Sequence, residues 1–364
     1  MTDYKKLENL LQCPVTKERL NYCENIRDTN LAETVIAESK AANGFINESH
    51  SVFYPVMNGI IIMLPDYAFS TLEYKTNADV LTVKSFYDRY GWKKEDDGKY
   101  NDSKLFISQK SVADTYAHLT AERIVPFLKN QGGGGGEYLL DIASGPLPKS
   151  DKPPLSRNFT YRICIDISIT ALEEARKNLG EQHGIFILGD ITNIPLRNES
   201  CDTVMSIHTL YHVPKDRQLT GMNELVRVCK TNANIVIAYN WGWHSMLMNL
   251  ALFPNRIVRL FGRMKKIVLK KTRKANNNSN TGLYFYSHSR AFFKRHKPAN
   301  TKLSFSVLKS LHKDFIDLYL GNTERSRRFL DRVYTLESKH PSFFGKHGAF
   351  PLIILEKTAE NTKF

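Results

Sequence analysis

The sequence predicts an α/β fold with a doubly wound, mostly parallel sheet, a small β-rich module ahead of it and a helical cap inserted into it. Five short apolar runs follow one another between residues 137 and 240, and helical stretches separate them. The runs are apolar almost throughout rather than at every second position. Strands of this kind are covered on both faces, which is typical of a parallel sheet between two layers of helices.

Residues 1–66 are predicted to form the β-rich module, because short apolar runs alternate there with turn signals. Asn58-Gly59 stands between apolar residues, which is a strong hairpin signal. Cys13 is followed by Thr16 where a CxxC pair would have its second cysteine. Since a zinc site needs four ligands, typically in such pairs, we expect no bound metal.

Residues 67–131 are predicted to be a helical extension, because apolar residues recur there at three- and four-residue spacing. Five glycines, Gly132 to Gly136, come next. They precede a strand instead of following one, as a phosphate-binding loop would, so we interpret them as a linker.

The α/β core is predicted over residues 132–240. Its strands are expected at 137–144, 161–168, 185–192, 201–209 and 233–240, and its clearest helices at 169–182 and 216–230. Residues 241–300 are interpreted as a basic amphipathic cap insertion, and residues 301–364 as the rest of the core, with strands at 305–316 and 349–357.

The charge of the chain is concentrated in one segment. Lys and Arg number 51 against 37 Asp and Glu, a formal net charge of +14, and residues 256–274 hold nine basic and no acidic residues. Three interpretations stay open for this segment: a lid over the substrate, a contact with an anionic membrane or lipid substrate, and a nucleic-acid contact.

The cysteines and the N-terminus bear on localisation. Five scattered cysteines form no CxxC pair, which favours reduced thiols. The N-terminus lacks the order of a signal peptide, and no apolar stretch reaches the roughly 20 residues that span a bilayer. We expect a cytoplasmic protein, either free or peripheral at a membrane.

Acidic residues close the first three core strands. Asp141 ends the first strand, Asp166 the second and Asp190 the third. Ligands of doubly wound sheets bind at these carboxyl ends. An acidic residue about 20 residues after the first strand is the spacing expected of a group that binds ribose hydroxyls.

These strand ends resemble the motifs of class I S-adenosylmethionine-dependent methyltransferases, particularly the ubiquinone and menaquinone C-methyltransferases. The resemblance covers about residues 138–241 and is carried by LLDIASGP, CIDIS, GDITNIPLRNESCDTVMSIHTLYHV and NELVRVCKTNANIVIAYNW. It implies a Rossmann-like fold and S-adenosylmethionine as the cofactor. Ala143 and Leu147 depart from the pattern, because family members often have glycine there.

The resemblance also implies site residues. On the cofactor side these are Asp141, Ala143, Ser144 and Gly145 at the methionine part, Asp166 with Ile167 at the ribose, Asp190 with Ile191 at the adenine, and Ser206 on the fourth strand. Tyr87 lies in an aromatic helical segment that folds over the cofactor as a lid in this family, although ordinary packing explains the aromatics equally well.

The end of the fourth strand faces the place of the methyl acceptor. His208, Tyr211 and His212 are the candidate catalytic residues, because they can bind or deprotonate an acceptor. A purely structural role for His212 at the turn is the alternative. Methyl transfer from a sulfonium is a direct displacement, so alignment supplies much of the catalysis.

The start of the chain has a resemblance of its own. LLQCPVTKERL followed by VFYPVMNGIIIMLPD is similar to a small zinc-ribbon module that activates some methyltransferases and is fused to certain rRNA methyltransferases, here without its metal ligands. The expected function is methyl transfer to a small or lipid-like acceptor. The rivals are an RNA methyltransferase and a non-catalytic protein of the same fold.

Overall fold

The computed structural model describes residues 2–28, 31, 41–72, 78–93, 100–101, 108–128, 135–147, 155–255 and 284–359. The basic segment 256–274 and most of the glycine run lie outside these residues. Within them, no helix has both the length and the apolarity needed to cross a bilayer.

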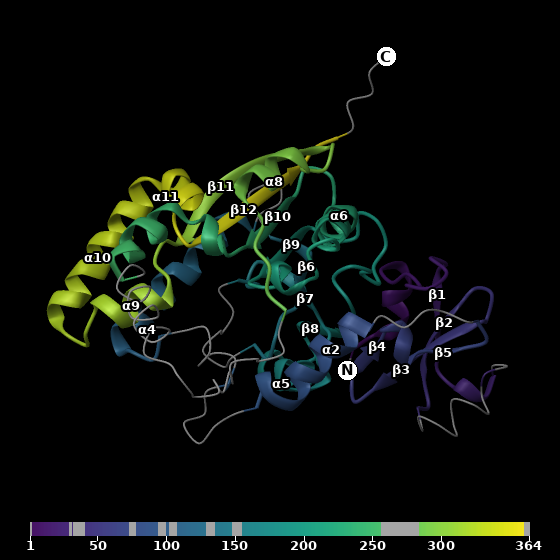
Figure 1. The fold of residues 1–364 in the computed structure, drawn as a ribbon. Helices are drawn as coiled ribbons and strands as arrows, with labels where there is room; N and C mark the ends of the chain where they lie inside the picture. Colours follow the sequence, from purple (N-terminus) through teal and green to yellow (C-terminus); the bar gives the residue numbers. More distant parts are fainter. Residues whose placement is uncertain are drawn as a thin grey trace, which may run out of the picture.

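The N-terminal residues form a small antiparallel unit (purple in Figure 1). Its elements are η1 (Tyr4–Asn9), β1 (Leu20–Cys23), η2 (Ile26–Asp28), β2 (Gly44–Asn47), β3 (Val52–Met57), β4 (Ile60–Ile62), η3 (Pro65–Tyr67) and β5 (Phe69–Ser70). The predicted hairpin joins β3 to β4, and Asn58 and Gly59 both have positive φ angles, of 50° and 75°. These angles fit the tight turn that an Asn-Gly pair favours.

The hairpin also joins the N-terminal unit to the core, which the sequence did not indicate. β4 pairs in parallel with β8 (Gly184–Leu188) at Ile60, Ile61 and Ile62. The strand order is therefore β1-β2-β3-β4-β8-β7-β6-β9-β10-β12-β11, with β5 on β3.

The core strands and helices confirm the predicted alternation. They are β6 (Gly136–Ile142), β7 (Phe159–Asp166), α5 (Ile169–Leu179), β8, β9 (Thr203–Ile207), η6 (Leu210–His212), α6 (Gln218–Val228) and β10 (Asn234–Ala238). β4 and the five core strands from β6 to β10 pair in parallel across the middle of the sheet. Ser168 caps α5 by accepting a hydrogen bond from the N–H of Ala171, and Gly180 ends the helix with a φ of 81°.

Helices precede and follow this core. Before it come α2 (Ala78–Phe86), the π-helical turn η4 (Tyr87–Gly91), α4 (Ser111–Ala121) and η5 (Glu122–Phe127). After it come η7 (Gly242–His244), a helical stretch at residues 246–255 and α8 (Arg290–Arg295).

The C-terminal part corrects one prediction. β11 (Thr301–Lys309) is a strand, but α9 (Lys313–Tyr319) occupies the second half of the predicted strand 305–316. His312 begins this helix by accepting a hydrogen bond from the N–H of Asp314. The helices α10 (Glu324–Lys339) and α11 (Pro341–His347) follow, and β12 (Phe350–Lys357) then inserts antiparallel between β10 and β11.

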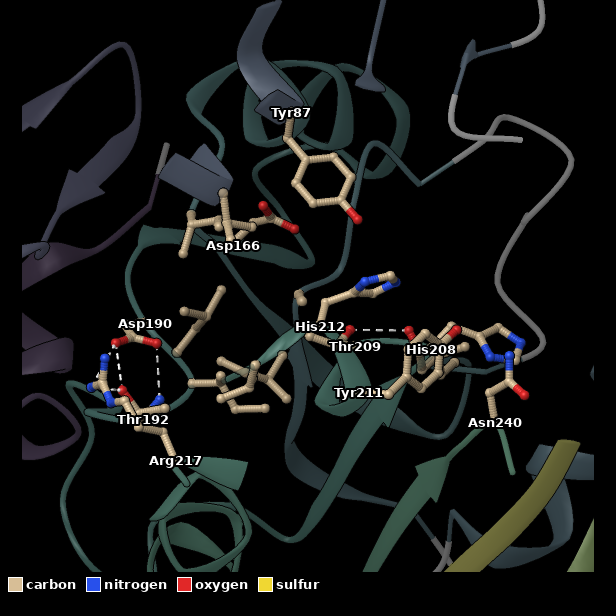
Figure 2. Close-up of a pocket in the computed structure, with 18 of the residues that line it drawn as sticks. Tyr87, Asp166, Asp190, Thr192, His208, Thr209, Tyr211, His212, Arg217 and Asn240 are labelled. Atoms are coloured by element: carbon tan, nitrogen blue, oxygen red, sulfur yellow. Dashed lines mark hydrogen bonds and ion pairs between the residues drawn. The ribbon is translucent and has the colours of Figure 1, made fainter. Parts of the chain in front are cut away.

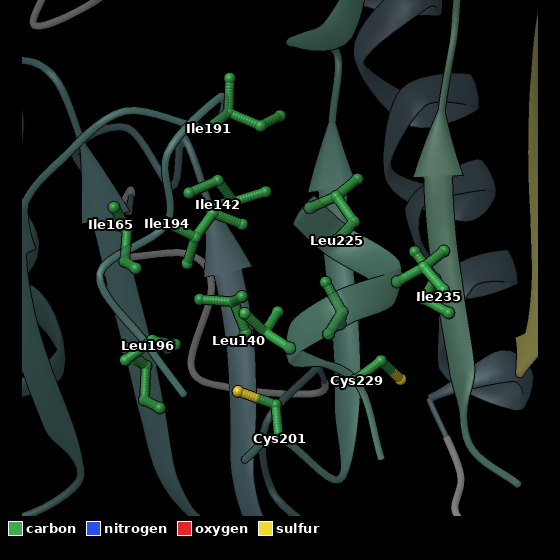
Figure 3. Close-up of a cluster of buried hydrophobic side chains, with 14 of the residues drawn as sticks. Leu140, Ile142, Ile165, Ile191, Ile194, Leu196, Cys201, Leu225, Cys229 and Ile235 are labelled. Atoms are coloured by element: carbon green, nitrogen blue, oxygen red, sulfur yellow. The ribbon is translucent and has the colours of Figure 1, made fainter. Parts of the chain in front are cut away.

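Buried side chains fill both faces of the sheet. One cluster, partly drawn in Figure 3, packs Leu140, Ile142 and Ile165 against Leu225 of α6 and Ile194. The other packs α4, α10 and the opposite faces of β10 and β12. Because the sheet is covered on both sides, its polar strand ends are the part left to meet a ligand.

Candidate functional site

A cavity of about 260 Å³ opens at the carboxyl ends of the parallel strands. Strand ends from one side of the sheet to the other contribute to it, and Figure 2 shows Asp166 and Asp190 at one side and His208 and Asn240 at the other. Two of the three acidic strand ends, Asp166 and Asp190, therefore share one cavity with the candidate acceptor residues.

The loop after β6 adopts the conformation that the family pattern of glycines suggests. Ala143, Gly145 and Leu147 have positive φ angles of 56°, 62° and 46°. Such angles cost a residue with a side chain about 1–2 kcal/mol, whereas glycine adopts them freely. Ala143 lines the cavity although it is not a glycine, so the backbone of this loop still lies against the site.

Asp166 is placed as a binding group at the end of β7. Its Oδ2 accepts the N–H of Gly145 at 2.9 Å and its Oδ1 accepts the N–H of Ser168 at 2.9 Å. Burial raises the pKa of Asp166 to about 6, while these two backbone N–H groups oppose the rise. A carboxylate has about four lone-pair sites, so it retains capacity for two further donors, such as the two hydroxyls of a ribose.

Asp190 lines the cavity at the end of β8, beside Ile191. Its Oδ1 accepts the N–H of Thr192 at 3.0 Å and its Oδ2 accepts the hydroxyl of Thr192. Arg217 lies 3.7 Å from the same carboxylate. Asp190 is thus held by its own turn, and Ile167 and Ile191 supply apolar surface between the two acids.

Four predicted cofactor residues do not line the cavity. Asp141 is buried and its Oδ2 accepts hydrogen bonds from Nη2 and Nε of Arg162, at 2.6 and 3.0 Å. Gly145 contributes through its N–H to Asp166, and Ser144 lies beside it. Ser206 is buried within β9, and the two residues after it, Ile207 and His208, line the cavity.

Tyr87 lies on the cavity wall, on the same side as Asp166 (Figure 2). Its ring stacks on Trp92 with 5.1 Å between centroids, and Trp92 also lines the cavity. The neighbouring Asp88 accepts a hydrogen bond from the hydroxyl of Ser168, at the start of α5. The aromatic segment is therefore attached to the Asp166 end of the site.

His208 has an unusual environment at the end of β9. Its φ of 60° is uncommon for a residue with a side chain, and strain of this kind is typical of functional positions. Its Nδ1 is buried without a hydrogen-bond partner among the described residues. Burial, with smaller effects of Lys309 and His212, lowers its pKa to about 3, so the ring is neutral at physiological pH.

His212 and Tyr211 also line the cavity from η6. Nδ1 of His212 lies 2.9 Å from the carbonyl oxygen of Tyr284, which can only accept, so Nδ1 carries the proton. Burial lowers the pKa of His212 to about 4. Tyr211 is packed edge-on against Tyr239. These contacts give both residues a structural role in addition to their place on the wall.

The lining residues that were not identified from the sequence include Asn240, Lys309, His312 and Phe350. Asn240 follows β10, and a polar amide just after the fifth core strand is a sequence signal from which this residue could have been predicted to line the site. Lys309 ends β11, Phe350 begins β12, and His312 lies in the turn between β11 and α9. His312 stacks on Phe350 with 5.7 Å between centroids and 10° between planes.

The chain matches one protein family. Residues 140–237 match the family described as "Methyltransferase domain", which is the segment that carries the acidic strand ends. No curated protein matches the chain.

Several solved structures have a similar fold at low identity. A phosphoethanolamine N-methyltransferase from Haemonchus contortus is 10% identical, covering 80% of this chain and 51% of its own, with a TM-score of 0.47. A geranyl diphosphate C-methyltransferase from Streptomyces coelicolor is 9% identical, over 78% and 100%, with a TM-score of 0.46. A complex of the Trm112 methyltransferase activator and a methyltransferase from Haloferax volcanii is 11% identical, over 68% and 92%, with a TM-score of 0.41. Similarity at this level carries no argument about substrate or partner.

Proposed function

We propose that this chain, an S-adenosylmethionine-dependent methyltransferase, transfers the methyl group to a small organic acceptor bound at the ends of β9, β10 and β12. The observation that supports this proposal is the division of the cavity. Its β8 and β7 side presents carboxylates, and its β9 to β12 side presents neutral imidazoles, an amide and an aromatic ring.

The described residues fit the cofactor on the carboxylate side. Asp166 would accept the ribose hydroxyls, and Asp190 with Ile191 would adjoin the adenine. Ala143 would adjoin the methionine part, and Tyr87 would cover the cofactor. When bound, the sulfonium supplies an activated methyl group.

The opposite side would orient the acceptor. His208 and Asn240 offer polar contacts, and Phe350 offers an apolar face. Because burial keeps the pKa of His208 near 3 and that of His212 near 4, these rings are weak bases. Their proposed role is to bind and align the acceptor, as a direct displacement requires.

A radiolabelled methyl group tests the proposal against both rivals. The purified chain is incubated with methyl-labelled S-adenosylmethionine and either a small-molecule extract or total RNA. Label in small molecules supports the proposal, and label only in RNA overturns it in favour of the RNA enzyme. Binding of S-adenosylhomocysteine with no transfer to either fraction would favour the non-catalytic rival.

A lipid-like acceptor is favoured by one further observation. Trp243, Leu250 and Phe253 are 77%, 73% and 58% exposed, and they directly precede the basic segment 256–274. Exposed apolar side chains next to cations are typical of a helix that rests on an anionic membrane. We propose that residues 241–300 serve as a cap that meets such a surface.

We also propose that residues 1–66 act as a metal-free scaffold. In place of a second cysteine, Thr16 donates its backbone N–H to Sγ of Cys13, at 3.3 Å, and Tyr54 lies 3.2 Å from the same sulfur. The module is joined to the core through β4 and β8. We further propose that residues 67–131 form the helical extension, residues 132–240 the cofactor-binding core and residues 301–364 the C-terminal part of the core.

A further inference from the structure

Lys309 places a cation in the cavity wall, at the carboxyl end of β11. The residue is half-buried, and its ammonium lies 4.6 Å from the centroid of the Phe350 ring. β11 changes register between Val307 and Lys309, which sets Lys309 opposite Phe350. Irregularities of this kind re-aim side chains beside binding sites.

No ion pair to Lys309 exists within the part of the chain that the structure describes, and burial alone lowers its pKa, to about 8. The acids of the cavity are occupied elsewhere, Asp166 by backbone N–H groups and Asp190 by Thr192 and Arg217. A partly desolvated ammonium without a counter-charge is unfavourable. An anionic ligand would remove that cost.

The groups around the ammonium suit an anion as well. The rings of His208 and His312 lie 5.3 and 5.7 Å from the Phe350 ring, over which the ammonium lies. Burial, with Lys309 as a smaller cause, lowers the pKa of both imidazoles, so both stay neutral. A neutral imidazole carries one N–H that can donate. Nδ1 of His312 accepts the backbone N–H of Asp314, so the proton of this ring is on Nε2.

The strand order separates Lys309 from the cofactor. The residues assigned to the cofactor lie at the ends of β8, β7 and β6, and β11 lies four strands beyond β6. The ammonium lies over the Phe350 ring, which packs against His208. We place it on the acceptor side of the cavity, because His208 and Phe350 lie beyond the strand ends assigned to the cofactor.

We infer that the methyl acceptor carries an anionic group, a carboxylate or a phosphate, that binds the ammonium of Lys309. This inference rests on the proposed function, because it assigns the charge of the acceptor at the same site. The parallel rings of His312 and Phe350 beside the ammonium further favour a flat apolar body next to that anionic group.

Charge-matched aromatic probes test the inference. The full chain is saturated with S-adenosylhomocysteine, and the dissociation constants of benzoate against benzamide, and of phenyl phosphate against phenol, are measured by ligand-observed NMR. We expect at least one anion to bind tenfold or more tightly than its neutral match. Benzoate identifies a carboxylate and phenyl phosphate a phosphate.

Variants assign the preference to Lys309. In Lys309→Met we expect the preference to fall below twofold, with unchanged affinity for S-adenosylhomocysteine and an unchanged or raised melting temperature. Lys309→Arg should keep the preference. The matched control is Lys302→Met, an exposed lysine of the same strand that pairs with Glu356 at 3.3 Å, and it should behave as wild type.

Three outcomes overturn the inference: equal binding of anions and their neutral matches, a preference that survives in Lys309→Met, and a tenfold loss of S-adenosylhomocysteine affinity in that variant. The last would show that Lys309 holds the carboxylate of the cofactor. Each of these outcomes differs from failure of the proposed function. That failure would appear in the labelling experiment, as label found only in RNA or in neither fraction.

Discussion

Asp166→Ala is expected to weaken binding of S-adenosylhomocysteine by about 1.5–3 kcal/mol, or roughly 10- to 150-fold. The carboxylate of Asp166 accepts the N–H groups of Gly145 and Ser168 and has capacity left for two ribose hydroxyls. Hydrogen bonds from neutral donors to a charged acceptor contribute about this much, and the loop at Gly145 loses its anchor as well.

The pH dependence gives an independent readout. The pKa of Asp166 is raised to about 6 by burial, so the carboxylate that the ribose needs is lost as the pH falls through 6. Wild-type affinity should therefore fall about tenfold between pH 7 and pH 5. In Asp166→Ala this dependence should vanish. The pKa values of His208 and His212, at about 3 and 4, lie below the range and leave both rings neutral throughout.

Calorimetric titration of wild type and variants at both pH values measures these effects. Asp202→Ala is the matched control, because Asp202 also accepts two backbone N–H groups, from Glu137 and Tyr138, but at the opposite end of the sheet. It should destabilise the fold without changing cofactor affinity. Equal affinities of wild type and Asp166→Ala at pH 7 would remove Asp166 from the site.

Three further predictions concern the acceptor side and the additions to the core. His208→Asn should keep cofactor affinity and thermal stability, because Asn tolerates the positive φ of His208. It should slow methyl transfer by less than about 100-fold, since a catalytic base contributes 100-fold or more. A larger loss of the transfer rate would make His208 a catalytic base. Purified protein should contain no stoichiometric zinc by elemental analysis, because Thr16 stands in place of the second cysteine, and one zinc per chain would revive the rRNA-methyltransferase interpretation. The third prediction concerns the simultaneous neutralisation of Arg263, Lys265, Lys266, Lys270 and Lys271. It should leave melting temperature and cofactor affinity unchanged and reduce binding to anionic vesicles by roughly 1 kcal/mol per cation that reaches the surface. A loss of RNA affinity instead would indicate phosphate contacts, and a large loss of cofactor affinity would place the segment in the cofactor site.

The parallel half of the fold was predictable from sequence because its signal is local. Each strand from β6 to β10 is largely apolar, and it ends in a polar residue or is followed by one within two positions, so both the strand and its functional end can be identified from one short window. Asp166 and Asp190 were found in this way, and both line the cavity. Asp141 satisfied the same rule, yet its partner Arg162 lies on the neighbouring strand and no sequence window shows that pairing.

The antiparallel half was harder to predict because its signal depends on pairing. Residues 305–316 read as one apolar strand, but the chain leaves β11 at Lys309, and His312 begins a helix. Whether the segment continues as a strand is decided by its partner β12, which begins at Phe350 opposite Lys309. Sequence separation of about 40 residues hides this register, so the lysine could not be placed in the cavity beforehand.

The parallel and the antiparallel strands contribute to different sides of the proposed site. The strands with local signals, β7 and β8, carry the acids assigned to the cofactor, which is the same molecule for every enzyme of this chemistry. The strands whose ends are set by long-range pairing, β11 and β12, carry Lys309 and Phe350, which we assign to the acceptor. A one-residue change of register in β11 would move the ammonium of Lys309 away from Phe350 without disturbing Asp166. In this proposal the charge selectivity of the acceptor pocket depends on the pairing of Lys309 with Phe350. Inserting one residue between Leu308 and Lys309 should therefore abolish the anion preference while S-adenosylhomocysteine still binds.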